Sequence, residues 1–165
     1  MYQTILVPLD GSAAAEQALP HLHSLLAHVA ATVRVHLLLV APSMQDYSVT
    51  MVNLYPFFPA RDYAAVARTD VERIEKDLRS YLGNLAERVA TWGSTATWEL
   101  RHGNPTDEIL GCAAEIGADL IVMTTHGRSG VNRWVFGSVA DRLLRNAPVP
   151  ILLVRARRDT TVEVS

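Results

Sequence analysis

Apolar positions along the chain follow two different spacings, and the two spacings alternate. Five short runs are rich in apolar or β-branched residues, or alternate between apolar and polar ones, as strands do. These runs occupy residues 4–9, 33–41, 95–103, 119–125 and 149–155. Between them, apolar residues recur every three or four positions, the spacing of one helix face. These helical patterns cover residues 13–30, 64–93, 104–118 and 138–148.

This alternation predicts an α/β fold with a mainly parallel sheet of five strands. Crossovers between parallel strands are right-handed, so helices must cover both faces of the sheet. Ligands of such sheets bind at the carboxyl ends of strands, where the strand order reverses. The segments after the first, second and fourth strands are therefore the candidate functional regions.

Local signals mark several helix ends. Asn104 and Pro105 are typical of a helix start, and Gly93 fits the end of the long helix. Pro20 stands inside the first helical pattern and predicts either a kink or a weak first turn there.

Residues 42–63 interrupt the alternation. They show no clear period and include three prolines and most of the chain's tyrosines and phenylalanines. Long irregular segments in compact domains are often functional. We consider three roles for this one: a lid, a surface for a protein partner, or a loop whose aromatic residues pack back on the core.

The composition of the chain mainly excludes certain classes of protein and partner. A chain of 165 residues with 49% hydrophobic and 19% charged residues fits one compact domain. A formal net charge of −2 gives no field that would attract nucleic acid or an anionic membrane. No apolar run approaches the ~20 residues that cross a bilayer, and the N-terminus does not resemble a signal peptide. We therefore expect a cytoplasmic protein with no nucleic-acid or membrane partner.

Few residues suggest catalysis or metal binding. Cys112, the single cysteine, cannot form an internal disulfide, and its apolar helical flanks favour a buried residue over a reactive thiol. No nucleophile with an adjacent base and no carboxylate pair stands out, so efficient catalysis is not expected. Four histidines show no spacing typical of a metal site: His21, His23, His28 and His36.

The segment TTHGRSGVNRWVFGS, residues 124–138, carries the strongest candidate chemistry. Its glycines, Gly127, Gly130 and Gly137, allow backbone N–H groups to approach a ligand closely. Gly137 and Ser138 lie where the next helix begins, and free N–H groups at a helix start favour an anion. These features predict a phosphate-binding loop.

A structural role for the same segment remains open. Ser138 and Asp141 have the spacing of a capping box, so Ser138 is alternatively only a helix cap. Arg128 and Arg133 either add positive charge beside a phosphate or are solvated loop residues. The segment is neither a Walker P-loop nor the G-x-G-x-x-G of dinucleotide folds.

Three motifs in order resemble the universal stress protein family. They are ILVPLDGSAAAEQAL near the N-terminus, RHGNPTDEIL in the middle, and THG followed by nine residues and GS, with SVADRLLRNAPVPILLVR behind it. The resemblance covers nearly the whole chain except about residues 42–62. It implies a domain over residues 1–156 with a flexible tail at 157–165, a sheet order of 3-2-1-4-5, and a homodimer paired through the last strand.

The resemblance also implies an ATP site with one departure. ATP-binding members of the family carry Gly-x-x-Gly, nine residues, then Gly-Ser or Gly-Thr, which Gly127, Gly137 and Ser138 match. Thr124 stands where the first glycine is expected. Its side chain either narrows the site or contributes its hydroxyl to phosphate or ribose contacts.

The remaining site residues follow from the same resemblance, except His126, which is a candidate because it lies inside the loop. Asp10 would face the ribose and phosphates through Mg²⁺, although DGS is also a good turn and helix-start sequence. The backbone of Val40 would hold the adenine edge, and His126 would stack on or hydrogen-bond the ligand. The full predicted set is Pro8, Leu9, Asp10, Val40, Thr124, His126, Gly127, Arg128, Gly130, Gly137, Ser138 and Val139.

The function that this resemblance implies is binding of ATP, or a related adenine nucleotide, as a regulatory ligand in a stress response. Mg²⁺ would accompany the nucleotide, and residues 42–63 would offer a surface to a protein partner. Two alternatives remain: a dimeric interaction or chaperone-like protein without nucleotide, and a slow ATPase.

Overall fold

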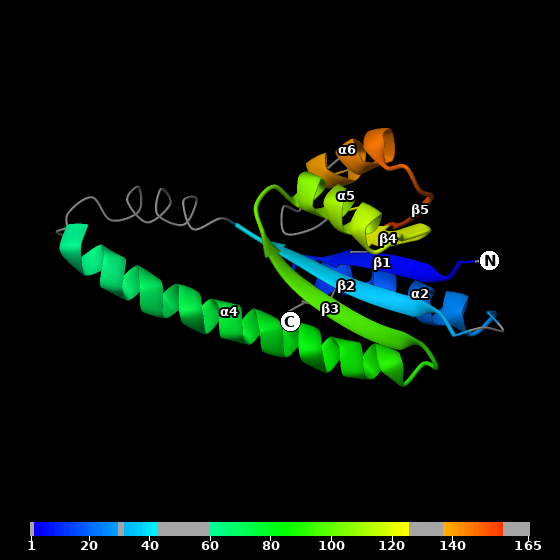
Figure 1. Ribbon diagram of the computed structural model, residues 1–165, viewed down its shortest axis with the longest axis horizontal. Coiled ribbons are helices and arrows are strands. Elements are labelled where there is room, and N and C mark those ends of the chain that lie inside the picture. Colours follow the sequence, from blue (N-terminus) through cyan, green and yellow to red (C-terminus); the bar gives the residue numbers. More distant parts are fainter. Residues whose placement is uncertain (1, 30–31, 43–59, 126–136, 157–165) are drawn as a thin grey trace, which may run out of the picture.

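The computed structural model describes residues 2–29, 32–42, 60–125 and 137–156, and its strands and helices alternate along the chain (Figure 1). The strands are β1 (Thr4–Leu9), β2 (Arg34–Ala41), β3 (Thr95–His102), β4 (Leu120–Thr124) and β5 (Ile151–Val154). The helices are α1 (Ala13–Glu16), α2 (Ala18–Leu26), α4 (Ala60–Ala90), α5 (Pro105–Glu115) and α6 (Ser138–Asn146).

All five strands are parallel and lie in one sheet of order β3-β2-β1-β4-β5. This confirms the predicted α/β fold and strand order. The chain winds outward from β1 through β2 to β3, then crosses to the other side of β1 for β4 and β5. The order therefore reverses between β1 and β4, and their carboxyl ends mark the point where α/β sheets bind ligands.

Two hydrophobic cores lie on opposite faces of the sheet. Successive residues of a strand point to opposite faces, so Ile5, Val7 and Leu9 pack in one core while Leu6 packs in the other. The first core is closed by α1, α2 and α4, and the second by α5 and α6. Strands buried on both faces explain the nearly continuous apolar runs in the sequence.

The helix starts follow local hydrogen bonding. Ser12 caps α1 by accepting a bond from the amide of Ala15. Asn104 caps α5 by accepting bonds from the amides of Thr106 and Asp107, and Pro105 is the first helical residue, as predicted. The first helical pattern is broken at Gln17, so Pro20 lies in the first turn of α2, where a proline is tolerated.

Helix α4 begins earlier than the sequence pattern predicts. It starts at Ala60, inside the segment that we expected to be irregular, and directly after Pro59. A proline is compatible with a position just before a helix, so it does not prevent this start. The helix ends at Ala90, and Gly93 in a left-handed conformation (φ 84°) stops it as predicted.

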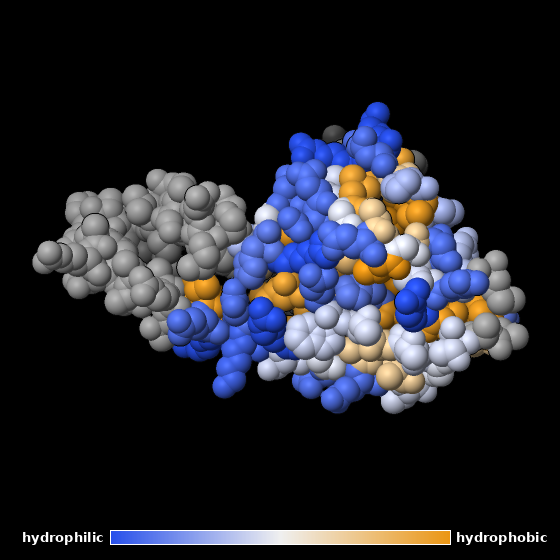
Figure 2. All heavy atoms as spheres, in the orientation of Figure 1, coloured by the Kyte–Doolittle hydropathy of each residue, from blue (hydrophilic) through white to orange (hydrophobic). Residues whose placement is uncertain are grey.

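The N-terminal turns of α4 project beyond the sheet (Figure 1). A contact from the middle of α4 ties it to the end of β3, since Glu75 Oε1 lies 2.9 Å from His102 Nε2. The outer face in this view is largely hydrophilic, with smaller apolar areas between the elements (Figure 2). Within the described residues, no helix combines the length and apolarity needed to cross a membrane.

Candidate functional site

A cavity of about 290 Å³ lies at the carboxyl ends of β1, β2 and β4. The starts of α5 and α6 complete its wall. It brings together eight residues that the sequence predicted as a site, from four separate parts of the chain. These are Pro8, Leu9, Asp10, Val40, Thr124, Gly137, Ser138 and Val139.

Seven further lining residues were missed by sequence reasoning. Most are apolar or small side chains whose sequence context predicts only a core position. Pro105 and Thr125 are exceptions, because Pro105 stands at a helix start after a strand and Thr125 is next to Thr124, and both positions could have been predicted as site residues. They are Ala15, Leu38, Pro105, Ile109, Met123, Thr125 and Ala140. The cavity therefore has a largely apolar wall with a few polar groups, as small-molecule sites commonly do.

Asp10 holds the turn that leads into α1. Its Oδ1 accepts hydrogen bonds from the Ser12 amide (3.0 Å) and the Ser12 hydroxyl (2.6 Å). Ser12 in turn caps the helix, so Asp10 orients the cap and is not the cap itself. The same residue also lines the cavity, so its structural position is compatible with the predicted site role.

Thr124 is the last residue of β4 and is buried. Along the strand, alternation places it on the side of Val122, toward α1 and α2, and places Met123 and Thr125 on the side of α5 and α6. The cavity is present with the Thr124 side chain in place. The threonine therefore does not fill this space.

The start of α6 corrects one prediction. Gly137, which has no side chain to accept a capping bond, is the N-cap residue, with φ −52° and ψ 151°, and Ser138 is the first helical residue. Asp141 does not complete a capping box either, because its carboxylate pairs with Arg145 at 3.1 Å. The sequence pattern predicted the N-cap at Ser138, one residue after the observed N-cap residue, Gly137.

Because Ser138 is not used as a cap, its exposed hydroxyl stands at the cavity wall beside the first turn of α6. The first amides of a helix have no partner within the helix and carry partial positive charge. Gly137 and Ser138 thus offer a polar part of the cavity wall to an anion.

Several predicted residues lie outside the described part of the chain. His126, Gly127, Arg128 and Gly130 belong to residues 126–136, as does Arg133. Most of the segment 42–63 and the tail 157–165 are likewise outside it. The predictions made for these residues stay predictions.

Cys112 behaves as the sequence indicated. It is fully buried on α5 among apolar neighbours. Burial raises the pKa of its thiol to about 11, because a thiolate is poorly solvated there, and the nearby Arg101 guanidinium only partly offsets this. The thiol is therefore protonated near neutral pH.

Comparison with known proteins gives a consistent result. A sequence profile of the Universal stress protein family matches residues 1–155. Universal stress protein MJ0531 of Methanocaldococcus jannaschii is 29% identical over 157 residues, which cover 94% of this chain and 83% of that protein.

The fold is also shared with solved structures. The MJ0577 protein superposes with a TM-score of 0.78 at 23% identity, covering 97% of this chain and 99% of that one. A universal stress protein in complex with cAMP gives a TM-score of 0.59 at 20% identity, covering 94% and 98%. An Arabidopsis thaliana protein of the family with AMP bound gives 0.60 at 13% identity, covering 98% and 97%. With the family profile spanning nearly every residue, this chain belongs to the universal stress protein family.

Proposed function

We propose that this protein binds ATP, or a related adenine nucleotide, in the cavity at the ends of β1, β2 and β4, as a regulatory ligand in a stress response. The observation that carries the proposal is the convergence of eight predicted site residues on one cavity at the reversal point of the sheet. These residues lie in or directly beside β1, β2, β4 and α6. Proximity in the sequence therefore does not explain why they meet at one cavity.

The two ends of the cavity suit the two ends of a nucleotide. Leu38, Val40 and Ile109 form apolar wall for an adenine ring. Gly137 and Ser138, at the start of α6, present helix amides to phosphate oxygens. The volume of about 290 Å³ lies just below the range of about 300–1,000 Å³ typical of small-molecule sites.

Mg²⁺ fits the same arrangement through Asp10. In nucleotide sites Mg²⁺ is usually held by one or two carboxylates together with phosphate oxygens. The Asp10 carboxylate lines the cavity, and its bonds to Ser12 fix its position. Mg²⁺ bound with the nucleotide would neutralise phosphate charge beside Asp10.

A regulatory role is favoured over catalysis by the chemistry of the wall. Of the described residues that line the cavity, Asp10 alone has a titratable side chain. General acid–base catalysis usually needs a positioned base within reach of the reacting group. Relatives of this fold bound to AMP and cAMP further support an adenine nucleotide as the ligand.

We also propose that the protein forms a homodimer through β5. This strand is at the edge of the sheet, where backbone groups are open to pairing. Two of the four exposed large apolar side chains of the described residues, Leu144 and Leu152, lie on α6 and β5. Leu152→Asp should convert the dimer to a monomer in size-exclusion chromatography with light scattering, and an unchanged mass would contradict this interface.

The nucleotide proposal is tested by mass spectrometry and thermal shift on the purified chain. Native mass spectrometry should detect co-purified adenine nucleotide. Millimolar ATP with Mg²⁺ should raise the melting temperature by the mass-action effect of a ligand that binds only the folded state. Gly137→Val should remove the shift.

The outcomes separate the alternatives. No shift with ATP, ADP, AMP or cAMP would exclude the proposed ligand class and favour an interaction protein without nucleotide. An equal shift with GTP would contradict adenine recognition. Phosphate release above background that Asp10→Ala abolishes would instead make the protein a slow ATPase.

A further inference from the structure

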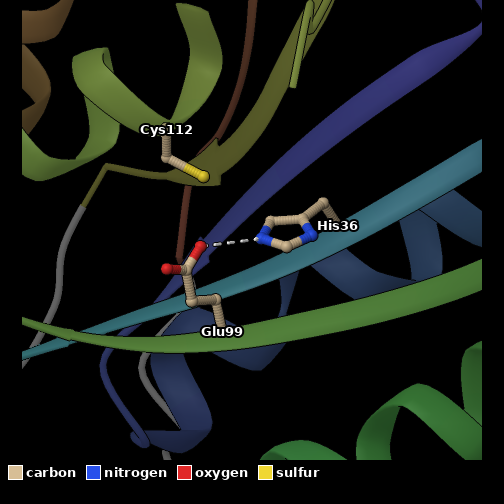
Figure 3. Close-up of side chains that lie close together, drawn as sticks. All are labelled: His36, Glu99 and Cys112. Carbon is tan, nitrogen blue, oxygen red and sulfur yellow. Dashed lines mark ion pairs between the residues drawn. The ribbon is translucent and has the colours of Figure 1, made fainter. Parts of the chain in front are cut away.

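Three side chains that metals commonly bind lie close together where β2, β3 and α5 meet (Figure 3). His36 comes from β2, Glu99 from β3 and Cys112 from α5, and one ligand atom of each lies within 4.8 Å of the other two. The imidazole and the carboxylate face each other, and the Cys112 sulfur points toward them from the helix. The nucleotide proposal uses none of the three.

Sheet register explains why they meet. In the parallel pair of β2 and β3, His36 lies beside Thr97 and Leu38 beside Glu99. Glu99 is therefore on the same face as His36 and two residues farther along. Helix α5 packs on this face, as Leu38 and Cys112 share one core.

His36 is oriented as a metal-binding histidine is. Its Nδ1 lies 2.8 Å from the Thr97 hydroxyl, while its Nε2 is inaccessible to solvent and has no hydrogen-bond partner. Nε2 lies 3.7 Å from Glu99 Oε2, too far for an ordinary hydrogen bond. A ring nitrogen held by an outer partner with the other nitrogen directed at the site is the usual arrangement around a bound metal.

The charge around the cluster suits a cation. The Arg101 guanidinium lies 3.0 Å from Glu99 and also pairs with Glu108 and Glu115. Three carboxylates thus surround one guanidinium among the described residues. Because Arg101 has two other partners, Glu99 can turn toward a metal without leaving that guanidinium unpaired.

We propose that His36 Nε2, a Glu99 carboxylate oxygen and Cys112 Sγ bind a divalent ion of the zinc type. Nitrogen, oxygen and sulfur ligands together suit Zn²⁺, whereas Mg²⁺ and Ca²⁺ prefer oxygen alone. Bond lengths of about 2.0–2.3 Å in a tetrahedral site separate ligand atoms by about 3.3–3.8 Å. A nitrogen and an oxygen ligand lie at the short end of this range, about 3.3–3.5 Å apart, so the His36–Glu99 separation of 3.7 Å needs to shorten by a few tenths of an ångström and Cys112 needs to approach by about 1 Å.

The proposed site is close to the cavity along β2 and α5. His36 is two residues from Leu38 on β2, and Cys112 is one turn from Ile109 on α5; both of those neighbours line the cavity. A bound ion would fasten α5 to β2 and β3 there. On binding, the Cys112 thiol releases its proton to solvent, and three protein ligands leave a fourth position for water.

Cobalt titration tests this directly. Co²⁺ replaces Zn²⁺ in such sites and gives a thiolate-to-metal charge-transfer band in the near ultraviolet when sulfur is a ligand. Since Cys112 is the only cysteine, that band reports this one side chain. Chelator-treated full chain should develop the band to one Co²⁺ per chain, and Zn²⁺ should displace it and raise the melting temperature.

Variants decide which residues are responsible. Cys112→Ser should lose the band, and His36→Gln and Glu99→Gln should each weaken Co²⁺ binding at least tenfold. His21→Gln, at an exposed histidine on α2, is the matched control and should bind as wild type. Melting curves without metal verify that each variant folds. No charge-transfer band in folded wild type, a band unaffected by both His36→Gln and Glu99→Gln, or half an ion per chain would overturn the proposal.

Discussion

The amide of Gly137 donates a 3.0 Å hydrogen bond to the carbonyl of Thr125, joining the start of α6 to the end of β4. The two backbones are so close that a Cβ on Gly137 would lie 3.1 Å from the same carbonyl oxygen. Both residues line the cavity. The glycine therefore sets the distance between the helix start and the strand end at the proposed phosphate position.

Gly137→Ala should weaken ATP binding about tenfold or more, because the strand end and the helix start must separate by a few tenths of an ångström. Isothermal titration calorimetry would measure the affinity. Gly83→Ala is the matched control, since a Cβ there meets nothing closer than 3.8 Å and lies within α4. That variant should bind ATP normally and gain roughly 0.5–1 kcal/mol in stability. Equal ATP affinity in both variants would contradict the assigned role of Gly137.

Asn104→Ala should lower the free energy of unfolding by about 1 kcal/mol, since its side chain accepts bonds from two amides at the start of α5. Ser138→Ala, at the start of α6, should change it by less than about 0.5 kcal/mol, because Gly137 and not Ser138 holds the N-cap position. Urea denaturation would measure both values. A loss of a full kcal/mol for Ser138→Ala would restore the capping role.

The contrast between these two helix starts shows what the sequence can and cannot predict. At Asn104 the following proline fixes the first helical position, so the cap is unambiguous. At Gly137-Ser138 both residues are acceptable caps, and the choice depends on the tertiary contact of Gly137 with Thr125. The helix-capping propensities of the two residues carry no information about that contact.

Parts of the fold and of the site were likewise predictable from local sequence, and other parts depend on tertiary contacts. The strand Thr4–Leu9 was predicted with its observed ends because an apolar run stops at the turn residues Asp10 and Gly11. Pro8, Leu9, Asp10, Val40 and Thr124 were predicted as site residues through the family motifs. Leu38, Ile109 and Met123 were not, because nothing in their sequence context distinguishes a core side chain from a cavity side chain. The cluster of His36, Glu99 and Cys112 was missed because only sheet register and helix packing bring it together.

Asp10→Asn should reduce the affinity for ATP with Mg²⁺ about tenfold while leaving AMP binding without Mg²⁺ nearly unchanged. The amide keeps an oxygen that accepts the Ser12 bonds, so the turn into α1 survives, but the negative charge that would face Mg²⁺ is lost. Titration calorimetry with each ligand gives the comparison. Asp10→Ala also removes the turn bonds and should cost about 1 kcal/mol in stability. Equal losses for both ligands in Asp10→Asn would assign Asp10 to the turn alone.

Thr124→Gly should improve ATP affinity by no more than about twofold, although it restores the glycine of the ATP-binding motif. The cavity is open with the threonine in place, and strand alternation places this side chain on the side of Val122. The variant should lose about 1 kcal/mol of stability, because glycine is costly inside a strand. A gain of tenfold or more in ATP affinity would mean that the threonine narrows the phosphate site.

Cys112 should resist alkylation in the folded, metal-free protein. Its thiol is fully buried and its pKa is raised to about 11, so the thiolate is scarce at pH 8. Mass spectrometry after iodoacetamide treatment should show labelling at least 100-fold slower than in denaturant, a factor that the raised pKa alone nearly supplies.

The raised pKa of Cys112 also determines how the free energy of unfolding changes with pH. The folded pKa lies above the unfolded one, so the thiol's contribution is full below about pH 9 and falls as the pH rises toward 11. Rapid alkylation of the folded chain would show that α5 opens readily from the sheet. Cys112→Ser does not ionise in this pH range, so this variant should flatten that part of the profile of unfolding free energy against pH.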